Sequence, residues 1–492
     1  MSANHYIAID LGAESGRVVL GSLSGGKVSI EEIHRFSNGP ISIGGSIRWD
    51  VLRLYDEIKA GLRKVAARGL PIASLSTDSW GVDYVLLAGK EPMLTAPYHY
   101  RDSRTDSAPK RLFKKVPWKR VFEETGIQFM QINTLYQLFA DVTQRPKVLK
   151  LADQFLTIGD YFNYLLCGAR KVDASLASTT QMYNPKTRKW SRAVIKGCGL
   201  PERIFPKIVP CGARLGEVLP SIAAETGLQG VQVVATCSHD TGAAVAAVPA
   251  EGKGWAYLSS GTWSLLGIES AEPIINEKSL AHNFTNEVGY GNSIRFLKNI
   301  VGLWVVQECR REWAKAGQEY SYEQLTRMAQ EAPPLARFIN PAAARFVKPG
   351  NMPEKVASYC RETGQEPPQT PGEMVRCTLE SLAMLYDKTL QEITAATGEK
   401  IERLHIVGGG TKNTLLNQLA ADATQIPVIT GPVEATAIGN ILIQALALKH
   451  LPSLTGLRQV VRDSFPVTTY QPKDAAAWED AKARFQKLTV VS

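Results

Sequence analysis

Three short stretches combine small residues with apolar runs in a pattern that can bind phosphate. Residues 10–17, Asp-Leu-Gly-Ala-Glu-Ser-Gly-Arg, follow a buried-type strand, and Ser259–Ser264 repeats the layout half a chain later. Turns of small residues expose backbone N–H groups that can bind an anion, and Arg17 can add charge-assisted contacts. Residues 406–413 place three glycines between an expected strand and helix, where a ligand or a packed helix can approach closely. Ordinary hairpin turns and tight packing are the alternatives.

Two carboxylates occupy positions where an apolar strand ends. Asp10 follows such a strand, and a carboxylate there is costly unless something such as Mg²⁺-phosphate binds it. Asp240 is the one charged residue in 233–248 when His239 is counted as neutral, and it lies between a β-branched run and an alanine-rich helix. A helix N-cap is the simplest interpretation of Asp240 by itself.

Other signals narrow the chemistry. Trp80-Gly81 interrupts an apolar strand, where an aromatic face and a small residue can bind a sugar, although core packing of Trp80 is the alternative. Residues 21–28 nearly match a Walker A loop, but Val28 stands where Ser or Thr must reach Mg²⁺. The sequence contains no GxGxxG, HExxH or GxSxG, so it supports neither a dinucleotide-binding fingerprint nor these hydrolase motifs.

The bulk composition is that of a folded soluble protein with more than one domain. The chain has 492 residues, which is too long for one hydrophobic core. Hydrophobic residues make up 44% of it and charged residues 21%, as is ordinary for a folded protein. It contains no apolar run of about 20 residues and no secretory leader pattern at the start, so we expect a cytoplasmic protein without a membrane partner. The seven cysteines show no zinc spacing and are expected as free thiols, with a Cys360–Cys377 bridge left open.

The net charge of +9 raises the question of a nucleic-acid partner. The densest basic stretch, Lys110–Arg120, includes Phe113 and Trp118 and is followed by two glutamates. One basic patch without a recognisable binding module favours a solvated helix face, so no nucleic-acid partner is expected. Positive charge also suits an enzyme that attracts anionic substrates.

The elements that must position these residues follow from apolar periodicity. The pattern predicts two similar hairpins, at 7–21 and 255–267, and alternating strands and helices, which together indicate an α/β protein. We expect a linker at 249–252 because Pro-Ala-Glu-Gly is typical of a break between domains. The remaining predicted elements are strands at 28–36, 72–87, 404–407 and 428–430, and helices at 51–67, 374–397, 413–423 and 434–448.

Taken in order, seven segments resemble the FGGY family of carbohydrate kinases, and the similarity runs from about residue 6 to about residue 470. The segments are AIDLGAESGRVVLG, STDSWGVDYVLL, PYHYRDSRT, CSHDTGAAV, YLSSGTWSLLG, LKNIVGLWVVQ and LHIVGGGTKNTLLNQLAAD. The resemblance implies two α/β domains of the ribonuclease H-like type found in actin and hexokinase, with a nucleotide and sugar cleft between them. The implied segments are 1–248 for the N-terminal domain, 253–450 for the C-terminal domain and 451–492 for an extension on the core.

The same resemblance implies a role for each matching residue. Asp240 matches the family's catalytic base and Asp10 the carboxylate associated with Mg²⁺-phosphate. Many family members have Thr at the positions of Ala13 and Glu14, and the role of Glu14 beside a polyphosphate stays open. ATP contacts are implied for Ala13, Glu14, Ser15, Gly16, Arg17, Thr262, Gln307 and Gly409, and sugar contacts for Gly81, His239, Asp240, Thr241 and Asn299.

The implied activity is phosphorylation of a ketose at its C1 hydroxyl by ATP and Mg²⁺, in a monomer or homodimer. L-rhamnulose is the ketose that the resemblance favours. L-fuculose, xylulose or ribulose as the substrate, and an actin-like ATPase with a binding role, are the alternatives.

Overall fold

The structure, a computed structural model, describes residues 3–490 and divides them into two compact units. Unit 1 comprises the chain up to Pro249 together with Glu269–Leu297 and Glu434–Phe465, and unit 2 comprises the rest. The units are therefore discontinuous, whereas the implied domains 1–248, 253–450 and 451–492 are continuous segments. Those continuous boundaries stay a prediction about the family's domains. The compact units show that two later segments fold with the N-terminal part of the chain.

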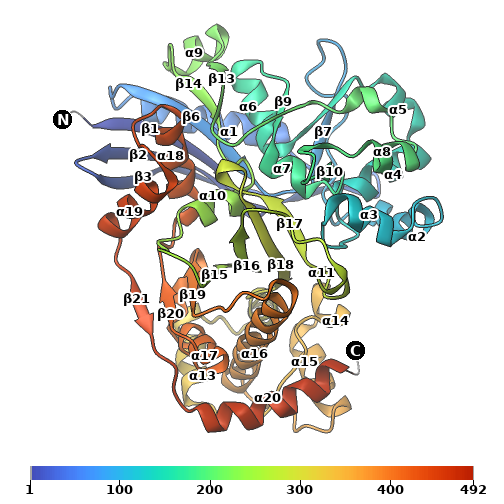
Figure 1. Cartoon of the computed structure of the whole chain (residues 1–492), viewed down its shortest axis with the longest axis vertical. Helices are drawn as coiled ribbons and strands as arrows, with labels where there is room; N and C mark the ends of the chain where they lie inside the picture. The colour runs from blue at the N-terminus through green and yellow to red at the C-terminus, as the bar shows by residue number, and fades with distance from the viewer. Residues whose placement is uncertain (1–2, 491–492) are drawn as a thin grey trace. The chain divides into compact units, whose positions relative to one another are not determined.

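Unit 1 is organised around a six-stranded sheet in the order β13-β14-β6-β1-β2-β3 (Figure 1). The strands β14, β6 and β1 run parallel, and β2 and β3 continue from β1 as antiparallel neighbours. The helices α1 and α6 pack on this sheet, and α18 lies against β1 and β6 although more than 350 residues separate them in the chain. The sheet strands are β1 (Asn4–Leu11), β2 (Ser15–Ser24), β3 (Lys27–Ser37), β6 (Ile72–Ser79), β13 (Ala213–Glu217) and β14 (Gln232–Ala235).

The sheet's core follows from its sequence pattern. Strand β1 is buried from Ile7 to Leu11 and is apolar there except for Asp10, as expected for a parallel strand covered on both faces. Asp50 caps α1 by accepting a hydrogen bond from the N–H of Arg53. The helices of unit 1 are α1 (Val51–Ala66), α2 (Ala108–Leu112), α3 (Trp118–Thr125), α4 (Thr134–Gln144), α5 (Pro146–Leu151), α6 (Ile158–Cys167), α7 (Ala174–Thr179), α8 (Arg192–Gly197), α9 (Pro220–Thr226), α10 (Asp240–Ala246), α11 (Glu277–Ala281), α18 (Ala435–Ala447) and α19 (Leu454–Ser464).

Smaller strand pairs complete unit 1, and short 3-10 turns occur at Ser103–Thr105, Glu202–Ile204 and Tyr290–Asn292. In the basic stretch, Phe113 and Trp118 pack on Phe129 and Arg120 forms an ion pair with Glu124. The remaining strands are β4 (Pro40–Ile43), β5 (Ser46–Trp49), β7 (Tyr84–Leu87), β8 (Gln154–Thr157), β9 (Lys171–Asp173), β10 (Tyr183–Asn184), β11 (Lys189–Trp190), β12 (Lys207–Val209) and β17 (Thr285–Val288).

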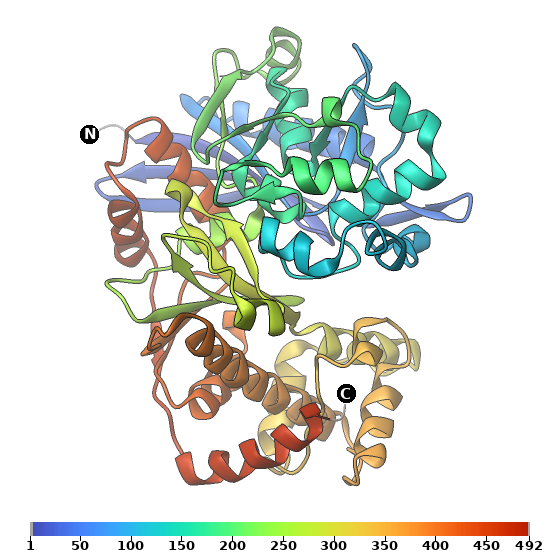
Figure 2. The same ribbon diagram turned by 45° about the vertical axis from the view of Figure 1, so that its right-hand side comes forward.

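The strands of unit 2 belong to a seven-stranded sheet in the order β17-β18-β16-β15-β19-β20-β21, in which β15 and β16 form a hairpin and β15, β19 and β20 run parallel. Its long helix α16 packs beside α13 and α17, and α20 lies against α16 and α17 (Figure 2). Two strands, β16 (Trp263–Ser270) and β18 (Ile294–Val301), continue from one unit into the other. The elements of unit 2 are β15 (Trp255–Ser260), α12 (Trp304–Lys315), α13 (Tyr322–Glu331), α14 (Ala344–Val347), α15 (Met352–Glu362), α16 (Pro371–Thr397), β19 (Arg403–Val407), a 3-10 turn (Gly409–Lys412), α17 (Thr414–Thr424), β20 (Val428–Thr430), β21 (Thr468–Tyr470) and α20 (Ala475–Val490).

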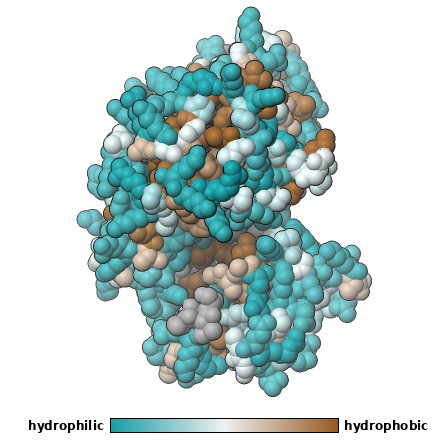
Figure 3. Space-filling model, turned by 90° about the vertical axis from the view of Figure 1, so that its right-hand side faces the viewer, coloured by the Kyte–Doolittle hydropathy of each residue, from teal (hydrophilic) through white to brown (hydrophobic). Residues whose placement is uncertain are grey.

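The surface and the cysteines are consistent with this core. The face in Figure 3 is mostly hydrophilic with apolar residues scattered among polar ones. In the described part of the chain, no helix is long and apolar enough to cross a bilayer. All seven cysteines are free thiols, and those of Cys360 and Cys377 lie in hydrogen-bonding contact within unit 2.

Candidate active site

Three aspartates of unit 1 meet at the carboxyl ends of neighbouring parallel strands. Asp10 is the second-last residue of β1 and is the register partner of Asp78 on β6. Ser79 pairs with His239 in an isolated parallel bridge, which places Asp240 beside the same edge, just after β14. Ligands bind at this edge of open α/β sheets, so the topology gathers groups that are far apart in the sequence at one site.

Asp10 is held in an ion pair by Arg17 from the adjacent strand β2. The guanidinium donates from Nε at 3.0 Å and from Nη2 at 2.7 Å to the same oxygen, Oδ2. Arg17 also forms an ion pair with Glu434, the residue before α18. Oδ1 of Asp10 accepts no hydrogen bond among the described residues and is available to a ligand. The structure therefore gives Arg17 a role in orienting Asp10, and its predicted phosphate contact stays a prediction.

Asp78 is a site residue that the sequence analysis missed. Its side chain is fully buried, and Oδ2 accepts a 2.6 Å hydrogen bond from the amide of Asn440 on α18. Oδ1 is buried without a hydrogen-bond partner. Burial raises the pKa of Asp78 well above its ordinary value, and the nearby carboxylate of Asp10 raises it further. The available signal was a carboxylate within the expected strand 72–87, but it was weaker than at Asp10 because Asp78 stands in the polar segment Ser-Thr-Asp-Ser.

Asp240 is the first residue of α10 and is not its N-cap, which is His239. One carboxylate oxygen, Oδ1, accepts the backbone N–H of Thr241 at 2.5 Å and faces the Thr241 hydroxyl at 3.1 Å. The other oxygen, Oδ2, accepts no hydrogen bond among the described residues. Burial raises the pKa of Asp240 and the nearby carboxylate of Asp10 raises it further, whereas the hydrogen bonds from Thr241 lower it. One fixed oxygen and one available oxygen suit a group that must accept a proton.

The predicted phosphate loop is the tight turn between β1 and β2. The N–H of Gly12 donates to the carbonyl of Ser15 at 2.9 Å, and Asn38 donates from its side chain to the Gly12 carbonyl at 2.7 Å. Glu14 is exposed at this turn, beside Ala13 and ahead of Ser15 and Gly16. The turn thus lies at the same edge of the sheet as Asp10, and its contacts with ATP stay a prediction.

Gly81 lies in a segment that is anchored by a buried carboxylate. Asp83 accepts the indole N–H groups of Trp49 at 2.6 Å and Trp80 at 3.1 Å, and the two indole rings pack with centroids 4.2 Å apart. A side chain at Gly81 would contact Thr179 at 3.2 Å, which leaves little room there for a larger residue. Burial raises the pKa of Asp83 to about 6. Trp80 is therefore a core residue, and the sugar contact of Gly81 stays a prediction.

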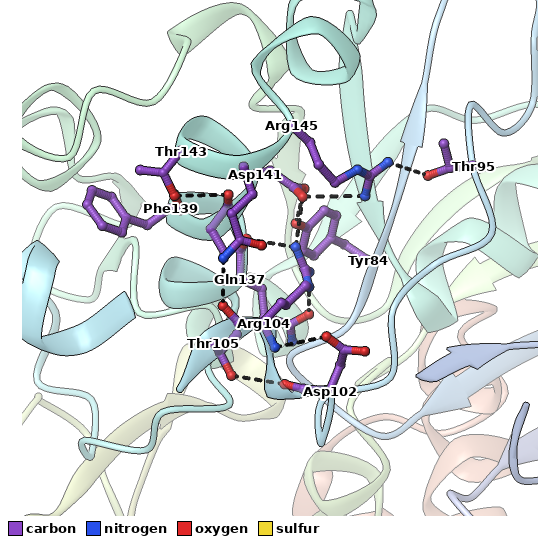
Figure 4. Close-up of polar contacts among 12 residues, drawn as sticks. Tyr84, Thr95, Asp102, Arg104, Thr105, Gln137, Phe139, Asp141, Thr143 and Arg145 are labelled. Atoms are coloured by element: carbon purple, nitrogen blue, oxygen red, sulfur yellow. Dashed lines mark hydrogen bonds and ion pairs between the residues drawn. The ribbon is translucent and has the colours of Figure 1, made fainter. Parts of the chain in front are cut away.

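A buried polar network supports this segment from α4 (Figure 4). Gln137 donates to Asp83 at 2.8 Å and accepts from Arg104 at 3.1 Å. Arg104 also donates to Asp141 at 2.7 Å, and Asp141 accepts the hydroxyl of Tyr84 at 2.6 Å. The network connects α4 to the residues on both sides of Val82, so it fixes the position of the Trp80–Gly81 backbone.

We expect Asp141→Asn to lower the stability of unit 1 strongly. The ion pair with Arg104 is almost fully buried, and removal of one partner leaves the other charge buried, at a cost of about 3–5 kcal/mol. The midpoint of urea unfolding, followed by tryptophan fluorescence, measures the effect. Glu31→Gln is the control, because its ion pair with Arg68 is exposed and such pairs contribute about 0–1 kcal/mol. Equal midpoints for the two variants would contradict a structural role for the network.

Four of the predicted site residues belong to unit 2, and three of them, Thr262, Gln307 and Gly409, lie on elements that contact or neighbour one another. Thr262 lies in the β15–β16 turn, and its carbonyl accepts backbone N–H groups from Gly302 and Trp304, at the start of the helix that carries Gln307. Gly409 is exposed in the turn after β19, the parallel neighbour of β15. Oε1 of Gln307 is buried without a hydrogen-bond partner, which fits a group that binds a ligand. Asn299 lies on β18, and its predicted sugar contact stays a prediction.

The glycine-rich turn of unit 2 has a packing reason. A Cβ atom at Gly410 would lie 1.9 Å from the hydroxyl of Ser260, and Gly408 has a positive φ of 89°. The glycines therefore let the turn after β19 lie directly on the β15 turn. Tight packing and ligand contact, which the sequence left as alternatives, are compatible here because Gly409 remains exposed beside the packed Gly410.

The acidic edge of unit 1 fits Mg²⁺ bound together with phosphate. In the described part of the chain, no group of three or more His, Cys, Asp or Glu side chains is placed to hold a metal ion. Mg²⁺ normally binds through one or two carboxylates plus substrate phosphates and water, so a complete protein cage is not needed. The available oxygen of Asp10 supplies such a ligand.

Family models match both halves of the chain. The N-terminal domain of the FGGY family of carbohydrate kinases matches residues 5–247, and its C-terminal domain matches residues 256–448. The chain belongs to the FGGY family of carbohydrate kinases. As a family member it is a carbohydrate kinase, and the family implies the use of ATP.

Individual relatives agree with the family assignment. The chain is 42% identical over 482 residues to the rhamnulokinase of Bacteroides thetaiotaomicron, covering 98% of this chain and 99% of that protein. It is 40% identical to the rhamnulokinase of Bacillus subtilis, covering 95% and 96% of the two chains.

Solved structures show the same fold at low identity. A gluconate kinase from Lactobacillus acidophilus superposes with a TM-score of 0.83 at 16% identity, over 100% of this chain and 98% of that chain. Glycerol kinase from Plasmodium falciparum, solved with ADP, gives a TM-score of 0.82 at 14% identity, over 99% and 98%. The expected two-domain α/β kinase fold is therefore confirmed.

Proposed function

We propose that this carbohydrate kinase transfers the γ-phosphoryl group of ATP to the C1 hydroxyl of L-rhamnulose. The observation that carries the chemistry is Asp240, whose Oδ1 is held by Thr241 while Oδ2 is available at the edge that also carries Asp10. The choice of sugar is supported by relatives about 40% identical over nearly the whole chain, which are rhamnulokinases.

In this proposal Asp240 is the general base. Its Oδ2 accepts the proton of the C1 hydroxyl as that oxygen attacks the phosphorus and ADP leaves. Phosphoryl transfer depends mainly on positioning and on stabilising charge, so the residues that fix the base and the phosphates matter most. His239, Thr241, Gly81 and Asn299 are the proposed sugar contacts, and residues 13–17 with Thr262, Gln307 and Gly409 are the proposed ATP contacts.

Asp10 is the residue that would hold Mg²⁺, through the oxygen that Arg17 does not use. The ion, when bound with ATP, neutralises charge on the phosphates. Arg17 in turn orients Asp10, because its guanidinium donates two hydrogen bonds to Oδ2 of that carboxylate.

A substrate panel tests the proposed sugar. ADP release with Mg²⁺-ATP is measured with L-rhamnulose, L-fuculose, L-xylulose, L-ribulose, D-xylulose, glycerol and no sugar. We expect the highest kcat/KM with L-rhamnulose, because a site built to hydrogen-bond particular hydroxyls discriminates strongly against sugars that misplace them. Faster turnover with another ketose would keep the kinase chemistry and replace the substrate. ADP release that is equal without sugar would contradict the proposal as a whole.

A further inference from the structure

A buried ion pair lies on the far side of the His239 ring from Asp240, and the proposed reaction does not use it. Arg295 on β18 is fully buried, and its Nη2 lies 3.1 Å from Oε2 of Glu287 on β17. The same nitrogen donates toward Nδ1 of His239 at 3.0 Å. His239 Nε2, on the other side of the ring, lies 3.5 Å from Oδ1 of Asp240. All four residues belong to unit 1.

This arrangement is costly unless it has a purpose beyond packing. Burial of an ion pair loses hydration energy, and a well-packed apolar pair of similar volume is often as stable or more stable. Glu287 compensates the charge of Arg295, and Arg295 in turn lowers the pKa of Glu287. Because Arg295 contacts His239 and His239 faces Asp240, the ion pair reaches the candidate active site through the ring of His239.

The chemistry of the groups limits the tautomer of His239. A guanidinium is always protonated and can only donate, so an N–H of Arg295 directed at Nδ1 requires a lone pair there. Neutral imidazole then carries its proton on Nε2, which faces Asp240. The other tautomer carries the proton on Nδ1, which lies 3.3 Å from Oε2 of Glu287. In that tautomer two N–H groups, those of His239 Nδ1 and Arg295 Nη2, would point at each other.

We propose that Arg295 and Glu287 are positioning residues that hold His239 in its Nε2–H tautomer. Thr241 then donates its N–H and hydroxyl to Oδ1 of Asp240, the Nε2–H of His239 faces the same oxygen at 3.5 Å, and Oδ2 is left to accept the substrate proton. This inference rests on the proposed role of Asp240 as the base. It adds that a buried ion pair on the strands β17 and β18 orients the base through His239.

The tautomer can be observed without turnover. Long-range ¹H–¹⁵N spectra of the full chain labelled with ¹⁵N-histidine distinguish Nδ1–H, Nε2–H and imidazolium forms, and loss of one spin system in His239→Gln assigns the residue. We expect the ring proton of His239 on Nε2 and a lone pair on Nδ1, as the contact with Arg295 requires. An Nδ1–H form or an imidazolium would overturn the proposal. Because no substrate is present, this result does not depend on which sugar is phosphorylated or on whether any is.

A double replacement tests the cause. Arg295→Met with Glu287→Leu removes both charges together, so neither is left buried alone. We expect the Nε2–H preference of His239 to be lost and kcat to fall about tenfold with an unchanged KM for ATP, because the Nε2–H that faces Oδ1 of the base is no longer held there. An unchanged tautomer would overturn the roles of Arg295 and Glu287.

The matched control is Arg458→Met with Glu269→Leu, which removes another largely buried ion pair of unit 1. Arg458 contacts the carbonyl of Val245, at the opposite end of α10 from Asp240. We expect the tautomer of His239 to stay the same in this variant. A loss of the Nε2–H form in both double variants would show a general loosening of α10 and would contradict the proposal. If the double variants do not fold, the tautomer of His239 observed in the native chain decides the proposal.

Discussion

Replacement of Asp240 by Asn is expected to lower kcat with L-rhamnulose by about 10²–10⁴-fold, the usual contribution of a general base. The amide oxygen of Asn can still accept the N–H of Thr241, which Oδ1 accepts at 2.5 Å in the native chain. The start of α10 should therefore stay intact, while the available Oδ2 becomes an amide group that cannot take a proton. Initial rates of ADP formation at saturating ATP and sugar measure the effect, and the KM for ATP should change little.

Asp50→Asn is the matched control. Asp50 is also an aspartate at the start of a helix in unit 1, and its Oδ1 accepts the N–H of Arg53 at 3.1 Å. It caps α1, and Asn is an equally good N-cap, so turnover and stability should both remain near the native values. If the two variants lose activity equally little, Asp240 has only a structural role at the start of α10.

Much of the fold could be predicted from local pattern. The structure confirms the expected helix at 51–67 as Val51–Ala66 and the expected strand at 428–430 as Val428–Thr430. The interruption at Trp80-Gly81 separates β6 from β7 as expected. Apolar periodicity and caps act within a few residues, so a single sequence carries enough information for these elements.

Long-range organisation could not be read in the same way. The segment Glu434–Phe465 folds with unit 1, because the amides of Asn440 and Gln444 on α18 bind Asp78 and the carbonyl of Ile7. Nothing in the local pattern of α18 shows that its polar residues face another strand rather than solvent. A polar residue on a helix is ordinarily read as exposed, and the pairing that buries it is set only by the tertiary fold.

In the candidate site, too, some residues could be predicted from the local sequence and others could not. Asp10 and Asp240 could be singled out because each is a carboxylate that follows an apolar strand. Asp78 carries the same signal but lies inside a polar segment, Ser-Thr-Asp-Ser, that resembles a turn. Arg295 and Glu287 could not be recognised, because strand residues with charged side chains usually face water. Their burial follows from the tertiary fold, in which β17 and β18 pair and Arg295 contacts His239.

Gly439→Ala is expected to disrupt both folding and activity, although alanine normally favours a helix. Gly439 lies within α18, and a Cβ atom there would be 1.8 Å from the carbonyl oxygen of Ala243 on α10. The obstacle is backbone, so no rotamer change can relieve it and α10 must move. Overpacking of this kind costs about 1–3 kcal/mol. A displacement of about 1 Å at Asp240, which begins α10, can lower turnover about 10²-fold.

The sign of the effect makes the test decisive, because helix propensity predicts the opposite result. In an open helical position, Gly→Ala stabilises a protein by about 0.4–1 kcal/mol. Gly456 on α19 of the same unit is such a position, since a Cβ atom there would meet its neighbours at ordinary contact distances of 3.4 Å or more. Urea unfolding and kcat are therefore compared for Gly439→Ala and Gly456→Ala. Destabilisation and loss of turnover confined to Gly439→Ala would establish that the contact between α10 and α18 positions the base. A stabilised and active Gly439→Ala would mean that α10 is free to shift, and that the position of Asp240 is determined by the strand before it and by His239.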